Sequence, residues 1–352
     1  MQRSLSVSKS MSQAVNISIE LKQSRHKKNR VLIVLALLTV LSLILAMTQG
    51  SVKIPLADLP RLLFSNDLSN QELIYQRLLI NIRFPRVLLA ALAGGVLAFS
   101  GASLQALFRN PLAEPGLIGV SAGASLGAVL SIVILGGGFW VIAPMAFLGS
   151  LGATLLAYLI GKRYGGVAGL LLAGIAINAI AFSVIGLMTY LATDTELRDL
   201  TFWSMGSVAT GTWHLLFGLI PWSILCLAFL WPQWRAMNVL LLGPQEVQHL
   251  GFDIKQLRWR MVIGVSLLIA PLVAVTGGIA FIGLVVPHIV RMLLGGNYRH
   301  VLPASLFGGA MLLIWADYFA RTMIAPAELP VGLLTSMIGG PFFLWLLLKN
   351  RR

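Results

Sequence analysis

The segment FRNPLAEPGLIGVSAG, residues 108–123, interrupts an apolar chain with an arginine, an asparagine, two prolines and an acid. Pro111 and Pro115 lack the amide hydrogen that a continuing helix needs, so they end one helix and allow another to begin. Leu, Ala, Ile and Val dominate the sequence on both sides. The segment therefore predicts a turn between two long apolar helices.

The composition of the whole chain indicates a membrane protein. Of 352 residues, 57% are hydrophobic and only 11% are charged, whereas a soluble domain has about 25% charged residues. The mean hydropathy is +0.86. Runs of about 18 or more apolar residues are long enough to cross the ~30 Å hydrocarbon layer as helices. We expect an all-α, polytopic membrane protein.

Uncharged runs predict the membrane spans, which are 31–49, 87–108, 117–135, 139–160, 166–193, 212–231, 301–316 and 329–348. The run 261–290 has 30 residues, too many for one upright helix and too few for two full ones. Gly277 and Gly278 lie inside it, and glycine is where a helix breaks most easily. The count is therefore nine spans or ten.

Charge distribution distinguishes these counts, because Lys and Arg concentrate on the cytoplasmic side. With ten spans and a cytoplasmic N-terminus, the inner segments hold 19 of the 26 Lys/Arg and 4 of the 12 Asp/Glu; with nine spans they hold 15 Lys/Arg. Ten spans with both termini cytoplasmic separate the charge better. The net charge of +14 then reflects topology rather than nucleic-acid binding.

Two regions flank or organise these spans. Residues 1–30 are polar, hold seven Lys/Arg and predict a basic cytoplasmic tail, so 31–352 form a single transmembrane domain.

Gly119, Gly123 and Gly127 are spaced four residues apart. They form a stripe of small residues that lets a neighbouring helix approach closely in lipid.

Catalytic motifs receive little support. GVSAG (119–123) matches G-x-S-x-G, but a serine nucleophile elbow needs a preceding strand, and only His288 lies deep in an apolar run. A membrane-embedded serine hydrolase using Ser121 remains an alternative. No metal-binding motif and no P-loop occurs, so we expect no metal, no cofactor and no ATP hydrolysis by this chain.

An ion-coupled carrier is a further alternative, since such carriers usually keep an acid at mid-membrane. Here Asp317 and Glu328 lie at outer span ends. Arg83, Arg86 and Arg321 are also on the outer side, where they are either solvated or clamp carboxylates of a partner in bidentate pairs.

The inner segment 232–260 predicts two short amphipathic helices. Its apolar and polar residues are punctuated by Gly243-Pro244 and Gly251. Such helices either lie at the membrane interface or form a docking surface for a soluble partner.

Together these stretches resemble the permease subunits of the ABC importers for iron chelates, hemin and vitamin B12. The matching motifs are IRFPR (82–86), SGASLQALFRNPLAEPGLIGVSAGA (100–124), LLAGIAINA (171–179), FWSMGS (202–207), LGPQEVQHLG (242–251), AFIGLVVPH (280–288) and ELPVGLLTSMIGGPFF (328–343). The resemblance implies a type II ABC importer permease fold with ten spans, in the cell inner membrane, working as a homodimer with the pathway between its subunits.

The resemblance also implies two kinds of partner. Two cytoplasmic ATPase subunits would dock on coupling helices at about 236–253, through Leu240, Leu242, Gly243, Glu246, Leu250 and Gly251. A periplasmic binding protein would dock its glutamates on Arg83, Arg86 and Arg321. Helix packing and gating would involve Asn178 with the glycine stripe. Pro244 departs from the family, which usually has an acid after this glycine.

The segment TDTELRDLTFWSMGS (193–207) most resembles the hemin-importing branch. The transported ligand is therefore expected to be hemin, with a ferric siderophore or cobalamin as alternatives.

Overall fold

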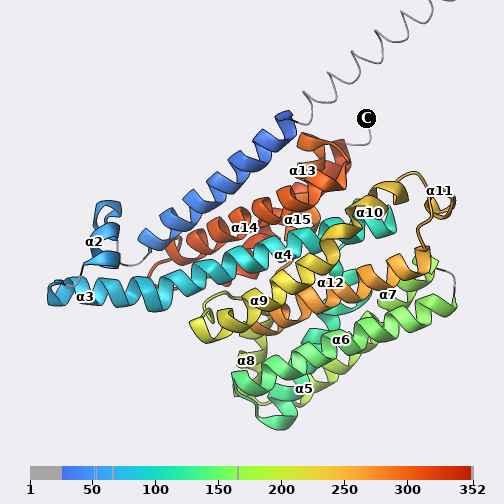
Figure 1. The fold of residues 1–352 in the computed structure, drawn as a ribbon. Coiled ribbons are helices and arrows are strands. Elements are labelled where there is room, and N and C mark those ends of the chain that lie inside the picture. The colour runs from blue at the N-terminus through green and yellow to red at the C-terminus, as the bar shows by residue number, and fades with distance from the viewer. Residues whose placement is uncertain (1–25, 51, 53, 66, 165, 350–352) are drawn as a thin grey trace, which may run out of the picture.

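The structure is a computed structural model that describes residues 26–349, except residues 51, 53, 66 and 165. Within these residues all regular secondary structure is helical (Figure 1). After a first helix, His26–Thr48, the α-helices are α2 Leu59–Phe64, α3 Asn70–Arg77, α4 Phe84–Phe108, α5 Val120–Leu135, α6 Phe139–Arg163, α7 Gly166–Leu191, α8 Asp194–Ser204, α9 Trp213–Leu230, α10 Trp234–Leu240, α11 Pro244–His249, α12 Ile254–Thr276, α13 Ile282–Leu294, α14 Tyr298–Thr322 and α15 Val331–Lys349.

Among the described residues, seven helices are long and apolar enough to cross a membrane. They are His26–Thr48, Asn70–Phe108, Phe139–Arg163, Gly166–Leu191, Trp213–Leu240, Ile254–Thr276 and Tyr298–Thr322. Three shorter apolar helices accompany them, Val120–Leu135, Ile282–Leu294 and Val331–Trp345. The expected polytopic, all-helical class is confirmed at this level.

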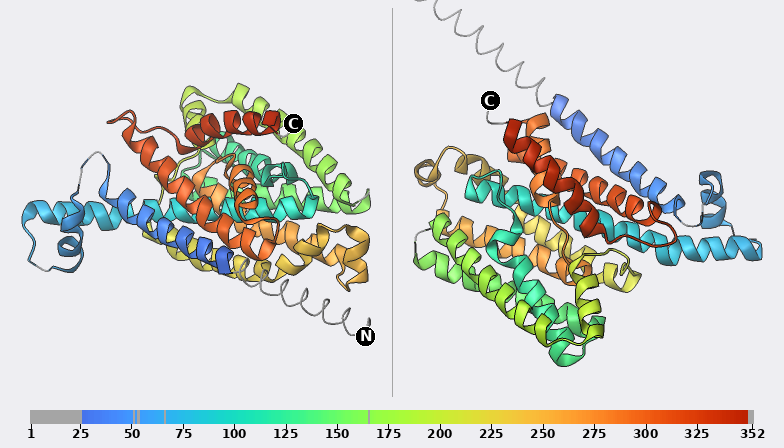
Figure 2. Two further views of the ribbon diagram at one scale, coloured as in Figure 1. Left: turned by 90° about the horizontal axis from the view of Figure 1, so that it is seen from above. Right: turned by 180° about the vertical axis from the view of Figure 1, so that it is seen from behind.

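The two ends of the molecule differ. The start of the first helix, α10–α11 and the end of α15 lie at one end, whereas α2 and α3 project at the other (Figures 1 and 2). After the expectations from the sequence, we call these the coupling end and the outer end. The turn after α4, which holds Pro111, is at the coupling end, since α3 and α4 run from the outer end toward it (Figure 1).

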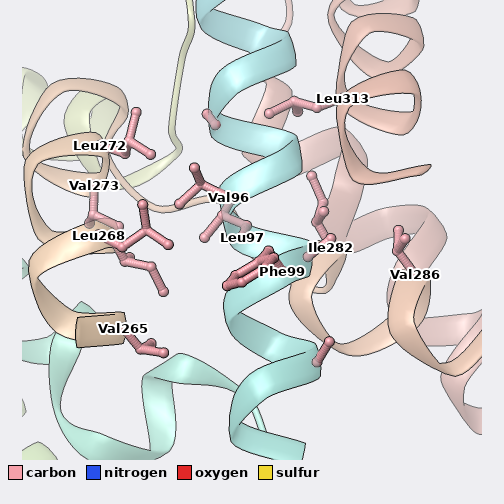
Figure 3. Close-up of a cluster of buried hydrophobic side chains, with 14 of the residues drawn as sticks. Val96, Leu97, Phe99, Val265, Leu268, Leu272, Val273, Ile282, Val286 and Leu313 are labelled. Atoms are coloured by element: carbon pink, nitrogen blue, oxygen red, sulfur yellow. The ribbon is translucent and has the colours of Figure 1, made fainter. Parts of the chain in front are cut away.

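The core is built around α4, whose side chains pack against α12, α13 and α14 (Figure 3). Phe99 and Val96 meet Leu268 and Leu272 on one side, while Ile282 lies on the other (Figure 3). All five side chains are almost completely buried. Because α4 has partners on several sides, it is apolar around most of its circumference rather than along one stripe.

The apolar run 261–290 does break at its glycines. Helix α12 ends at Thr276, Gly277 adopts a φ of 69°, and α13 begins at Ile282. Glycine readily adopts a positive φ, so the glycines in this run were enough to predict the helix break from the sequence.

Three expected boundaries are corrected. The span expected at 87–108 begins earlier, because α3, a π-helical segment Leu78–Arg83 and α4 form one continuous helix, Asn70–Phe108. The span expected at 301–316 extends over Tyr298–Thr322, because arginines neutralise the charge of Asp317 inside it. Of the expected tail, residues 1–25 lie outside the described residues, and His26–Arg30 belong to the first helix.

The glycine stripe of α5 lies against α6. A methyl group added at Gly123 would overlap the carbonyl oxygen of Gly149 and come within 2.5 Å of Ala153 Cβ. At Gly127 it would overlap the carbonyl oxygen of Met145. Gly119 has a φ of 91° and caps the start of α5. The backbones of α5 and α6 are therefore so close together that only small residues fit between them.

Candidate functional site

One candidate site is a cavity of about 550 Å³ beside the turn between α4 and α5. Its lining combines that turn with parts of α5, α7, α15, the end of α8 and the loop between α12 and α13. The polar residues in this lining are Glu114, Ser121, Asn178, Ser204 and Ser336. The break at Gly277 thus contributes backbone to the cavity through Gly278–Phe281.

Glu114 is the one acidic residue in the lining of this cavity. It precedes the short 3-10 helix Pro115–Ile118, and partial burial raises the pKa of its carboxyl above the ordinary range. The sequence predicted the turn that holds Glu114 but not that Glu114 lines a cavity. Its position between two prolines, which hold the turn away from helical geometry, was the available signal.

Asn178 fastens α7 to the same turn. Its amide Nδ2 donates a 3.0 Å hydrogen bond to the carbonyl oxygen of Gly116. Its Oδ1 is buried, and within the described part of the chain it accepts no hydrogen bond. Because the other face of Asn178 lines the cavity, a shift of α7 relative to the turn would change the cavity wall.

Ser121 lines the same cavity, but the structure does not bring it to a histidine. His288 lies on α13 in a different, much smaller cavity, beside Pro111 and Phe342. Across the described ranges, no hydrogen bond joins Ser121 to a base, and no group of three or more His, Cys, Asp or Glu side chains is placed to hold a metal ion. The geometry gives no support to the serine hydrolase.

Ser121→Ala is expected to leave transport near the wild-type level, because the change removes one small hydroxyl and keeps the packing of α5. Initial uptake rates in proteoliposomes would measure the effect. Loss of transport by a variant that is expressed and folded normally would contradict this expectation and revive a chemical role for Ser121.

The segment after α9 contains the residues expected to couple to an ATPase. It forms α10, a turn at 241–243 and α11, with positive φ values at Gly243 and Gly251. Leu242 and Leu250 are 70% and 57% exposed, and Glu246 is also exposed. Leu240 differs from the expectation, because it is buried within this chain.

The three outer arginines lie together at the outer end, and they form an internal network. Arg86 donates to Asp317 Oδ1 from Nη2 at 2.8 Å and from Nε at 3.0 Å, and to Glu328 Oε2 from Nη1 at 2.8 Å. Arg321 Nε lies 3.0 Å from Asp317 Oδ2. Asp317 is thus shared between two guanidinium groups, and its side chain is 1% exposed.

Arg83 and Arg321 are buried, in contrast to the exposed positions expected from the sequence. Arg83 donates to the carbonyl oxygens of Met47, Thr48 and Val52. Arg321 donates to those of Ala46 and Gln49, each at 3.2 Å. They cap the carbonyl-rich end of the first helix, where cations are favourable. Glu328 is the most accessible member, with a side chain 48% exposed, and the side chain of Arg86 is 11% exposed, compared with 4% for Arg83 and 6% for Arg321.

Asp317→Asn is expected to destabilise the protein by about 3–5 kcal/mol, because it leaves two largely buried guanidinium groups without their shared carboxylate. A lower midpoint of thermal unfolding in detergent would show it. Glu328→Gln is the matched control, since it removes an exposed acid from the same network and should change the midpoint little. Equal midpoints for Asp317→Asn and the wild type would contradict a structural role for this carboxylate.

Comparison with known proteins identifies the class of protein to which this chain belongs. The sequence matches the FecCD transport family over residues 37–349, and the chain belongs to that family. It is a permease subunit of an ABC importer and a multi-pass inner-membrane protein. It is not itself an enzyme, and the ATPase is a separate subunit.

Individual relatives agree with this assignment. The chain is 46% identical to the hemin transport system permease protein HmuU of Yersinia pestis, over 77% of this chain and 83% of that one. It is 36% identical to the vitamin B12 import system permease protein BtuC of Vibrio vulnificus, over 92% and 96%. A solved structure, described as a metal-chelate type ABC transporter in an inward-facing conformation, has a TM-score of 0.82 and 31% identity, covering 91% of this chain and 99% of its own.

The resemblance drawn from the sequence motifs is therefore confirmed. Family membership replaces both alternatives from other classes, the serine hydrolase and the ion-coupled carrier.

Proposed function

We propose that this permease moves hemin across the inner membrane, using ATP hydrolysed by its partner subunits. The observation that carries the proposal is the 46% identity to a hemin permease, compared with identities between 36% and 40% to vitamin B12 permeases. The transported ligand would pass beside the cavity that contains Glu114 and Asn178. A ferric siderophore and cobalamin are the ligands against which hemin has to be tested.

The working assembly we propose has two copies of this chain, each with ten spans and cytoplasmic termini. Seven long and three shorter apolar helices of the described chain support that count. Exposed apolar side chains on α7 and α15, such as Ile175, Phe182 and Met337, are available to meet lipid or the second copy. Because the cavity that Glu114 and Asn178 line borders both helices, the pathway would lie between the two copies.

Uptake by a reconstituted importer tests the ligand. The permease, its cognate ATPase and its cognate binding protein would be placed in liposomes, with hemin, cobalamin or a ferric siderophore outside. We expect ATP-dependent accumulation of hemin, at an initial rate at least tenfold above that of the other two. Faster uptake of cobalamin or of the siderophore would overturn the assignment to hemin while leaving the importer class intact.

We also propose that the binding protein docks at the outer end, on the network of Arg83, Arg86 and Arg321. Arg86 supplies the accessible charge, and the two buried arginines hold the surface that carries it. A carboxylate of the binding protein would approach Arg86 in competition with Glu328, which is half exposed and bonded to the same guanidinium.

Arg86→Gln is expected to weaken docking of the binding protein at least tenfold, which corresponds to about 1.4 kcal/mol. Removing one partner of a charge pair at an interface typically costs more binding free energy than an exposed pair contributes, which is usually ~0.2–1 kcal/mol. The dissociation constant, measured at low and high salt, would test this, because rim charges are screened within ~8–10 Å.

Glu328→Gln is the control for this prediction, since it removes the internal competitor and should leave docking equal or tighter. Unchanged docking by a folded Arg86→Gln protein at low salt would remove this arginine from the interface.

A further inference from the structure

A second cavity, of about 550 Å³, lies near the coupling end and shares no lining residue with the cavity described above. It is bounded by the first helix, the α9–α10 junction and the start of α14. Its lining residues are Asn29, Leu32, Trp231, Trp234, Arg235, Arg299, His300 and Pro303. Neither the transport pathway nor the coupling segment α11 accounts for it.

Two cations in this cavity gather around one aromatic ring. The guanidinium carbon of Arg235 is 5.5 Å from the centroid of the Trp234 ring, and that of Arg299 is 5.7 Å away. Such contacts are attractive because the face of the ring carries negative charge. Two positive charges are therefore held at one ring, and no acidic side chain of the described residues forms an ion pair with either.

The surroundings are also basic. Lys28 on the first helix extends to the loop before α14, where its Nζ would lie 3.8 Å from a methyl group placed on Gly295. None of the eight residues that line the cavity is acidic. An anion in this cavity would meet favourable charge from three separate helices.

Hydrogen bonds fix the two arginine-bearing helices to each other. Asn238 on α10 accepts from the backbone N–H of Tyr298 at 2.8 Å, and its amide donates to Asn297 Oδ1 at 3.1 Å. Arg235 and Arg299 lie within a few residues of these contacts. The spacing of their backbones is thus set by the fold, so a bound anion would not have to order two independent helices.

The other lining residues include two polar ones, Asn29 and His300, and three that are apolar or aromatic. These three are Leu32, Trp231 and Pro303, and Trp231 stacks against Phe99 with ring centroids 6.4 Å apart. Tryptophan concentrates at membrane–water interfaces, where its ring lies at the level of the lipid headgroups. Two arginines beside apolar side chains match a ligand that has an anionic head and a hydrocarbon body. A fully soluble anion would make no contact with the apolar side chains.

We propose that this cavity binds the headgroup of an anionic phospholipid. The phosphate accepts hydrogen bonds from Arg235 and Arg299, whose planar guanidinium groups suit phosphate oxygens. The glycerol and the start of the acyl chains lie along Leu32, Trp231 and Pro303. Basic pockets between transmembrane helices are a known way of holding such headgroups. A bound lipid would join the first helix, α10 and α14, and so brace the helix that leads into α11.

The test is lipid binding by the full-length protein purified in detergent and titrated with phosphatidylglycerol or with zwitterionic phosphatidylcholine. Native mass spectrometry would count the bound lipids. We expect phosphatidylglycerol to be retained at least tenfold more tightly than phosphatidylcholine. Arg235→Gln with Arg299→Gln should abolish that preference, whereas Arg235→Lys with Arg299→Lys should keep part of it.

The matched control is Lys162→Gln with Arg163→Gln, which removes two exposed cations from the end of α6. We expect less than a twofold change in this variant. An equal loss in both double variants would show attraction to overall charge and overturn the site, as would an unchanged preference in the Arg235/Arg299 variant.

Two further arms separate the remaining explanations. Glycerol 1-phosphate should displace the lipid at least a hundredfold less effectively than phosphatidylglycerol; equal competition would mean that the cavity takes a soluble phosphate and would overturn the lipid assignment. Both arginines are exposed, so the variants should fold. If the double variant does not fold, the single variants Arg235→Gln and Arg299→Gln must each weaken retention, and unchanged retention in both would overturn the proposal.

Discussion

Replacing Gly123 by leucine is expected to abolish transport and to leave little folded protein in the membrane. The first added carbon would overlap the carbonyl oxygen of Gly149, and Ala153 Cβ blocks the other direction. Adding atoms to a packed interior usually costs about 1–3 kcal/mol, but here the obstacle is backbone, so α5 and α6 would have to separate. Helix association in lipid depends on this close packing, because no hydrophobic effect drives it there.

Gly152→Leu is the matched control for this experiment. Gly152 is also a helical glycine, on α6, but a side chain added there meets nothing within 4 Å. The yield of monodisperse protein and the initial uptake rate should be near normal for Gly152→Leu and close to zero for Gly123→Leu. A folded, active Gly123→Leu protein would show that the two helices can pack in another way.

The second large effect is expected from Leu242→Asp combined with Leu250→Asp. Both leucines are exposed on this chain and flank α11, and we have proposed that the ATPase covers them. Burying two unpaired carboxylates in an apolar interface is strongly unfavourable, so the ATPase should no longer co-purify with the permease, and uptake should stop. The permease itself should keep its thermal stability, since neither side chain packs inside it.

Phe64→Asp serves as the control, because Phe64 is 83% exposed on α2, at the outer end. It should leave ATPase binding unchanged. Co-purification of the ATPase with the Leu242/Leu250 double variant would place the docking surface elsewhere.

Features with a local cause could be predicted from the sequence. The break in 261–290 depends on glycine, and the turn at 108–123 depends on proline, so both signals lie in the residues that carry the structure. The family could be identified for a similar reason, because its motifs are continuous stretches of sequence.

Features that depend on distant partners could not be predicted. Arg86 and Asp317 are 231 residues apart, and nothing near either residue indicates that the other will neutralise it. For the same reason the sequence suggested exposed arginines where Arg83 and Arg321 are buried. Leu240 and Leu242 are equally apolar, and α10 is too short for its periodicity to tell the inward-facing leucine from the exposed one.

The arginine cap on the first helix has a consequence for biogenesis. The carbonyl oxygens at the end of that helix are shared between Arg83 and Arg321, and Arg321 is 272 residues further along the chain than Gln49. The ribosome must therefore complete almost the whole protein before this helix end acquires its second arginine. Until then this end of the first helix would be held by Arg83 and by the N–H of Ile54, which donates to the carbonyl oxygen of Thr48, so the helix would reach its final position late in synthesis.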